Sequence, residues 1–249
     1  MQSPVLVPEW PLPAGVQAAC STRAGGVSAP PYDSLNLGDH VGDAPAAVAE
    51  NRQRWAQHLG ARPVFLRQVH GNGVVVLDAA TPDGAEADAC LTRERGVACT
   101  MMVADCLPVL LCDARGGLVG AAHAGWRGLA GPAGGPGVLE ALVRHFEPQH
   151  TLAWLGPCIG PAAFEVGPEV KAAFEAADPA CGALFRPAGG KWLADLPGLA
   201  RRRLAALGVT RVHGNDGSEA WCTVANPSRF FSHRRDRVSG RFAASIWLA

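Results

Sequence analysis

The chain has 249 residues, of which 48% are hydrophobic and 18% charged, a balance typical of a globular protein rather than a disordered one. Its 22 Lys and Arg residues equal its 22 Asp and Glu residues, so net charge gives no reason to expect binding to nucleic acid or to an anionic membrane. The first eight residues lack a basic segment and contain prolines, which argues against a secretion signal. No apolar run approaches the ~18 residues that a membrane span needs, so we expect a cytoplasmic protein.

Strands and helices can be predicted along the chain from hydrophobic periodicity and turn residues. Short apolar segments predict strands over 16–21, 64–69, 74–77, 98–103, 109–112, 118–122, 152–155, 209–212 and 243–247. Asp43 as a cap and Pro45 in the first turn predict a helix that ends at Gly60. Further helices are predicted over 138–146, 169–177 and 196–207, and the glycine- and proline-rich segment 131–137 predicts a loop.

The order of these elements predicts the fold class. Helices flank a strand-rich middle from about residue 64 to residue 122, where strands follow one another directly. Such an order argues against alternating βαβ units and favours an α+β fold with mixed sheets. No internal repeat or long linker divides the chain, so we expect a single domain over residues 1–249.

Three polar residues stand at the ends of apolar strands, namely His70, Cys106 and His123. Two imidazoles and one thiolate make up a catalytic zinc set, which leaves an open position for water or substrate. The ligands are 36 and 17 residues apart and form no compact motif, so spacing alone leaves structural roles open. The other cysteines form no Cys-x-x-Cys pair, and most are expected to be buried thiols.

A second interpretation uses two of the same residues. Cys106 as nucleophile and His123 as its base would make a cysteine-hydrolase dyad, in which the imidazolium stabilises the thiolate. Metal binding and nucleophilic attack compete for the same thiol, and the sequence does not separate them.

Several arginines could hold an anionic group. Arg23 lies in a glycine-rich turn, and Arg127 follows His123 by four residues. Arg234 begins a basic cluster with Arg235, Arg237 and Arg241. Guanidinium groups bind phosphate or carboxylate in bidentate fashion, although such a cluster near a terminus is commonly a solvated face.

Three further side chains are weaker candidates. Asn36 and Gln68 could hydrogen-bond a sugar or a base edge, and either could equally satisfy the backbone of a turn or strand. Asp105, next to Cys106, could orient a ligand or bond to the backbone. No carboxylate is placed clearly enough to serve as a general acid.

A series of segments in a fixed order resembles the YfiH-like laccase-domain family, also called the polyphenol oxidase family. The resemblance extends from about residue 16 to residue 246. Its motifs are TRAGGVS (22–28), SLNLG (34–38), QVHG (68–71), ADCLPV (104–109), AHAGWRG (122–128), LGPCIG (155–160) and FSHRR (231–235).

The resemblance implies an α/β/β/α sandwich with mixed sheets layered between helices. It places metal ligands at His70, Cys106 and His123, with zinc as the metal and copper as the alternative. It implies phosphorolysis of the purine nucleosides adenosine, inosine and methylthioadenosine, with adenosine deamination as a second reaction. Cys106, His123, Arg127 and Asp105 are then the catalytic candidates. The substrate-binding candidates are Arg23, Asn36, Gln68 and Arg234.

Three other functions can be compared with this one. Eight scattered histidines do not supply the paired motifs of a multicopper oxidase, so copper oxidase activity is discounted. A cysteine hydrolase or amidase that edits a cell-wall precursor would use Cys106 and His123. A metal-binding partner protein without turnover would use the ligands alone.

Overall fold

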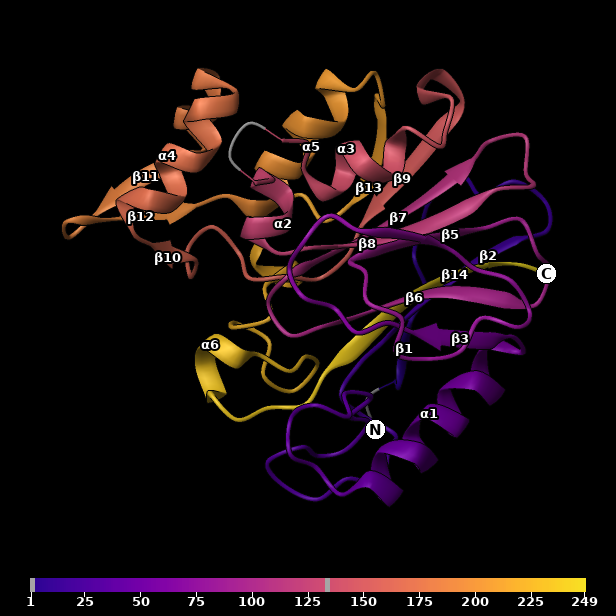
Figure 1. Cartoon of the computed structure of the whole chain (residues 1–249). Helices are drawn as coiled ribbons and strands as arrows, with labels where there is room; N and C mark the ends of the chain where they lie inside the picture. Colours follow the sequence, from indigo (N-terminus) through magenta and orange to yellow (C-terminus); the bar gives the residue numbers. More distant parts are fainter. Residues whose placement is uncertain (1–2, 133–134) are drawn as a thin grey trace.

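Two β-sheets that face each other form the centre of the fold, as Figure 1 shows for the computed structural model, which describes residues 3–132 and 135–249. The five-stranded sheet has the order β1 (Val5–Leu6), β2 (Val16–Ser21), β14 (Phe242–Leu248), β6 (Val97–Val103) and β3 (Arg62–Phe65). The six-stranded sheet has the order β13 (Arg211–Gly214), β9 (Thr151–Leu155), β7 (Leu107–Asp113), β8 (Val119–Ala124), β5 (Ala89–Thr92) and β4 (Val74–Val76). Both sheets contain parallel and antiparallel pairs, so both are mixed.

Helices cover the outer face of each sheet (Figure 1). The helix α1 (Pro45–Leu59) packs on the five-stranded sheet. On the six-stranded sheet lie α2 (Trp126–Ala130) and α3 (Val138–Val143), with α5 (Leu196–Ala206) packed beside α3, whereas α4 (Pro168–Ala177) packs on α2 and on the small sheet. A small sheet has the order β10 (Glu165–Val166), β12 (Lys191–Ala194), β11 (Phe185–Ala188), and the short α6 spans His233–Asp236.

Three apolar cores hold these layers together. Side chains such as Leu110, Trp154 and Ile246 are fully buried between the sheets. A second core joins the six-stranded sheet to its helices, and a third, around Trp55, joins α1 to the five-stranded sheet. The expected α+β fold with layers α/β/β/α is confirmed. The layers form because each helix and sheet has an apolar face that must be buried against another element.

Most predicted elements are present, with small differences in their bounds. The strand predicted over 16–21 matches β2, and Gly60 ends α1 in the left-handed conformation with φ 61°. The prediction that Asp43 caps α1 is wrong, because its carboxylate instead accepts hydrogen bonds from Ser28 and Asn36. The loop predicted over 131–137 separates α2 from α3, and its residues 133–134 lie outside the described residues.

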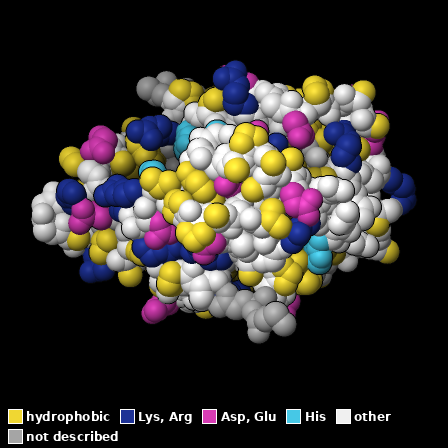
Figure 2. Space-filling model, turned by 90° about the horizontal axis from the view of Figure 1, so that it is seen from below, with side chains coloured by type: hydrophobic (Ala, Val, Ile, Leu, Met, Phe, Trp, Pro, Cys, Tyr) yellow, Lys and Arg dark blue, Asp and Glu magenta, His cyan; other side chains and the backbone are white. Residues whose placement is uncertain are grey.

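The surface is consistent with the balanced composition. The face in Figure 2 carries basic and acidic side chains that alternate with apolar ones. No described helix is both long enough and apolar enough to cross a membrane.

The buried Asn51 of α1 gives a test of how the loop 27–36 is held. Its side chain accepts the amide of Val27 and donates to the hydroxyl of Ser28 and the carbonyl of Asn36. Asn51→Ala leaves these groups without partners, and we expect the free energy of unfolding to fall by about 2–4 kcal/mol in urea denaturation. The exposed Gln53→Ala on the same helix should change it by less than about 0.5 kcal/mol; equal effects of the two substitutions would contradict this account.

Candidate metal centre and cavity

Three chain segments that are distant in sequence meet at one end of the six-stranded sheet. Cys106 directly precedes β7, and His123 lies on β8, which pairs with β7 in antiparallel register so that His123 faces Pro108. His70 lies in the segment that connects β3 to β4. The register alone therefore brings the thiol next to His123, and the connecting segment adds the second imidazole.

The three side chains have the spacing of metal ligands. One ligand atom from each of His70, Cys106 and His123 lies within 4.8 Å of the others, and Cys106 Sγ is 3.7 Å from His70 Nε2. Zinc bonds of about 2.0–2.3 Å in a tetrahedron imply ligand separations of about 3.3–3.6 Å. The donor set and its spacing fit a zinc-type ion with a small closing movement.

Asp88 holds two of these ligands in place. Its fully buried carboxylate lies 2.9 Å from His123 Nδ1 and accepts the backbone amides of Val69, His70 and Gly71. Burial alone would raise the pKa of Asp88, but His123 and these amides outweigh it and hold the pKa below its ordinary value. Since Asp88 engages Nδ1 of His123, the Nε2 atom remains available to bind a metal, an arrangement common around metal-bound histidines.

The backbone around the ligands is strained and closely packed. His70 has φ 62°, a left-handed conformation that costs about 1–3 kcal/mol in a residue with a side chain. Gly125 has no room for a side chain, because a Cβ atom there would lie 2.8 Å from His70 Cδ2 and 3.0 Å from Cys106 Sγ. The glycine therefore lets β8 approach both ligands.

Cys106 and His123 favour each other's charged forms. Burial alone would raise the pKa of Cys106, yet the charge of His123 and the hydrogen bonds from both histidines lower it to about 6. Burial alone would lower the pKa of His123, and the Cys106 thiolate together with Asp88 raises it to about 9. Without a metal, the pair is a thiolate beside an imidazolium.

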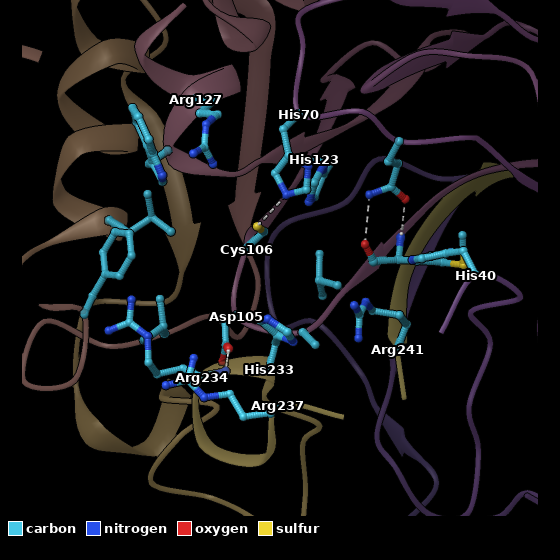
Figure 3. Close-up of a pocket in the computed structure, with 18 residues that line it drawn as sticks. His40, His70, Asp105, Cys106, His123, Arg127, His233, Arg234, Arg237 and Arg241 are labelled. Atoms are coloured by element: carbon cyan, nitrogen blue, oxygen red, sulfur yellow. Dashed lines mark hydrogen bonds between the residues drawn. The ribbon is translucent and has the colours of Figure 1, made fainter. Parts of the chain in front are cut away.

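The cluster opens into a cavity of about 420 Å³ (Figure 3). Its volume suits a small molecule such as a nucleoside. One part of its wall is apolar and includes Ile159, Phe164 and Leu196, while the rest is polar and basic. The polar and basic residues of the wall are His40, Gln68, His70, Asp105, Cys106, His123, Arg127, His233, Arg234, Arg237 and Arg241.

Three of the sequence-predicted binding residues line this cavity. Arg127 is exposed, and its guanidinium lies 4.5 Å from the ring centroid of Trp126. Arg234 donates from Nη1 to the carbonyl of Ala163 at 3.3 Å. The amide of Gln68 is already paired with the backbone of Met102 through two bonds of 2.9 Å, so it braces the wall.

The structure does not bring Arg23 and Asn36 to the cavity. Arg23 forms an ion pair with Asp33 at 3.2 Å and donates to the carbonyl of Pro227 in a separate surface depression. Asn36 is fully buried, and its amide donates to Gly38 and accepts the backbone N–H of Arg241. Local partners thus satisfy both side chains, and no contact supports the substrate role predicted for either.

Asp105 lines the cavity but uses both carboxylate oxygens inside the protein. It accepts the hydroxyl of Thr223 at 2.6 Å and the backbone N–H of Arg234 at 2.6 Å. Both oxygens thus have a partner within the protein, and no contact supports the catalytic role predicted from the position of Asp105 beside Cys106.

Sequence reasoning missed several residues of the site. Asp88 precedes a strand that had not been predicted, so nothing marked it as a partner of His123. His40 carried no partner signal in the sequence, and His233 was visible only as part of the FSHRR motif. Arg237 and Arg241 were visible only as members of a basic cluster, and the fold turns both toward the cavity.

Comparisons with known proteins agree with this architecture. The family model described as "Multi-copper polyphenol oxidoreductase laccase" matches residues 17–249. A Neisseria meningitidis crystal structure is similar with a TM-score of 0.92 and 45% identity over 99% of each chain. The Geobacillus stearothermophilus YlmD structure has a TM-score of 0.82 and 32% identity, over 94% of this chain and 92% of that one.

Curated relatives match over nearly their whole length. An Escherichia coli protein named "Purine nucleoside phosphorylase YfiH" is 51% identical over 250 residues, which is 99% of each chain. A Pseudomonas aeruginosa protein, also named purine nucleoside phosphorylase, is 51% identical over 98% of each chain. The chain therefore belongs to the laccase-domain family that contains the YfiH proteins.

Proposed function

We propose that this protein is a zinc-dependent purine nucleoside phosphorylase acting on adenosine, inosine and methylthioadenosine. The observation that carries the proposal is a His-Cys-His cluster that faces a nucleoside-sized cavity with four arginines in its wall. The names of the relatives from Escherichia coli and Pseudomonas aeruginosa support the same reaction.

His70, Cys106 and His123 would hold the metal, with Asp88 as the partner of His123. When bound, zinc supplies a Lewis acid and a water of lowered pKa, the chemistry that deamination at the purine C6 requires. A multicopper oxidase is disfavoured because the described residues contain one group with metal-ligand spacing, whereas such an enzyme needs several copper centres.

The chain's own residues would act by positioning and by charge. In phosphorolysis a phosphate oxygen bonds to ribose C1′, the C1′–N9 bond breaks, and its electron pair leaves with the purine. The proton of hydrogen phosphate ends on the purine, so ribose 1-phosphate and free base balance the equation. Arg127 and Arg234, which line the cavity, would hold anionic or ribose oxygens and would lower the barrier mainly by orientation and electrostatics.

One observation favours a second candidate. The lowered pKa of Cys106, about 6, makes its thiolate available at neutral pH, as a cysteine hydrolase or amidase requires. If the enzyme stays fully active in the presence of a metal chelator but is inactivated by a thiol reagent, this candidate is favoured over the metal enzyme.

Cys106→Ala tests the proposed reaction directly. With adenosine and phosphate, the zinc-loaded wild type should release adenine and ribose 1-phosphate, and a smaller amount of inosine. The variant loses a metal ligand, so we expect its adenine formation to fall by about 100-fold or more. Product chromatography with and without phosphate is the measurement.

The result separates the candidates. Absence of purine release from wild type loaded with zinc or copper would refute the phosphorylase and turn attention to amide substrates. Adenine formation independent of phosphate would indicate hydrolysis instead.

Asp88→Asn tests the metal centre without an activity assay. Asn keeps the size of the side chain but loses the charge and one acceptor for the amides of residues 69–71. Zinc affinity should fall by about 10- to 100-fold in competition with a chromophoric chelator. The exposed Asp216→Asn should bind zinc like wild type; unchanged affinity in Asp88→Asn would count against the ligand assignment.

A further inference from the structure

The positive charge in the cavity is not neutralised by carboxylates of the protein. Arg127, Arg234, Arg237 and Arg241 line the cavity and take part in none of the ion pairs formed by residues 3–132 and 135–249. Guanidinium groups gathered without counterions repel one another, so their grouping favours an anionic ligand.

Arg235 gives a contrast within the same helix. It forms an ion pair with Asp236 at 2.6 Å and donates to the backbone carbonyls of Thr223 and Phe230. Arg235 is thus a structural arginine, whereas its neighbour Arg234 turns toward the cavity. The basic cluster in the sequence therefore combines two different roles.

Arg241 is held firmly with donors to spare. Its Nη1 donates to the carbonyls of Ser239 and Gly240, and its backbone N–H donates to Asn36 Oδ1. Its stem packs so closely on Gly38 that a Cβ atom there would lie 2.7 Å from Arg241 Cγ. Nε and Nη2 form no hydrogen bond with the described part of the chain, which leaves two nitrogens with three N–H donors in a fixed position for a ligand.

Asp105 places Arg234 but does not neutralise it. The carboxylate receives the backbone N–H of Arg234 and the hydroxyl of Thr223, and no described guanidinium donates to it. It is the only carboxylate in the cavity wall among the described residues. The start of α6 is thereby tied to the residue next to Cys106, and the guanidinium remains available.

We propose that Arg234, Arg237 and Arg241 form an oxyanion subsite that holds inorganic phosphate, the second substrate of the reaction proposed above. In Figure 3 Arg234 and Arg237 lie beside Asp105 and His233, Arg241 lies across His233 on the side of His40, and Arg127 lies on the opposite side of Cys106. The inference rests on the proposed phosphorolysis. It also assigns Arg127 to the nucleoside side of the cavity.

The subsite suits the charge change of the reaction. Hydrogen phosphate enters as a dianion, and ribose 1-phosphate leaves as a dianion after the phosphate oxygen has bonded to C1′ and the proton has passed to the purine. Three guanidinium groups offset this charge on both sides of the reaction and fix the attacking oxygen by charge-assisted hydrogen bonds.

Steady-state kinetics with varied phosphate test the subsite. Arg234→Gln and Arg237→Gln should each raise the KM for phosphate by about 10-fold or more, with the KM for adenosine changed by less than about 2-fold. Arg127→Gln should instead raise the KM for adenosine by about 10-fold or more, with the KM for phosphate changed by less than about 2-fold. The exposed Arg186→Gln on β11, outside the cavity, is the matched control and should match wild type.

Calorimetric titration with inorganic phosphate alone separates this inference from the proposed function. Phosphate binding by wild type that weakens by about 10-fold or more in Arg234→Gln and Arg237→Gln supports the subsite even if no nucleoside is cleaved. Absence of phosphate binding to wild type overturns it, as does an affinity for phosphate in both variants equal to that of wild type. A rise in the KM for phosphate confined to Arg127→Gln overturns it as well.

Discussion

The buried carboxylate of Asp88 is the constraint on which the site depends. It binds three successive amides of residues 69–71 and the imidazole of His123, so one side chain joins the segment after β3 to strand β8. A buried carboxylate without such partners would cost several kcal/mol, about the size of a domain's whole stability. The contacts that stabilise this charge also fix the backbone of His70 and the imidazole of His123.

The same carboxylate accounts for the strained backbone at His70. A left-handed φ in a residue with a side chain persists only where its surroundings enforce it. Here the amides on both sides of the strained bond point at one acceptor, and Gly125 leaves the space that the turned imidazole occupies. Hydrogen bonds to the Asp88 carboxylate thus offset the local strain, and the imidazole of His70 points toward Cys106.

How much of this could be predicted from the sequence depended on whether a residue's partners were local or distant. His70, Cys106 and His123 could be selected because each borders an apolar strand, and the sheet end then brings them together. The strand β5 was missed, and with it Asp88, since nothing in the sequence near Asp88 refers to residues 69–71 or 123. Arg23 and, more weakly, Asn36 were also candidates in the sequence, but neighbours in the fold satisfy them.

The arrangement also shows how a chain of zero net charge can keep positive charge in one cavity. The exposed ion pairs cancel over the surface, whereas the cavity keeps guanidinium groups whose counterions are absent among the described residues. Asp105 joins the strand end that carries Cys106 to α6, and Asn36 joins the backbone of Arg241 to the loop held by α1. The His-Cys-His cluster and the basic wall therefore share a framework drawn from both sheets, so a shift in either layer would change the distance between the cluster and the arginines.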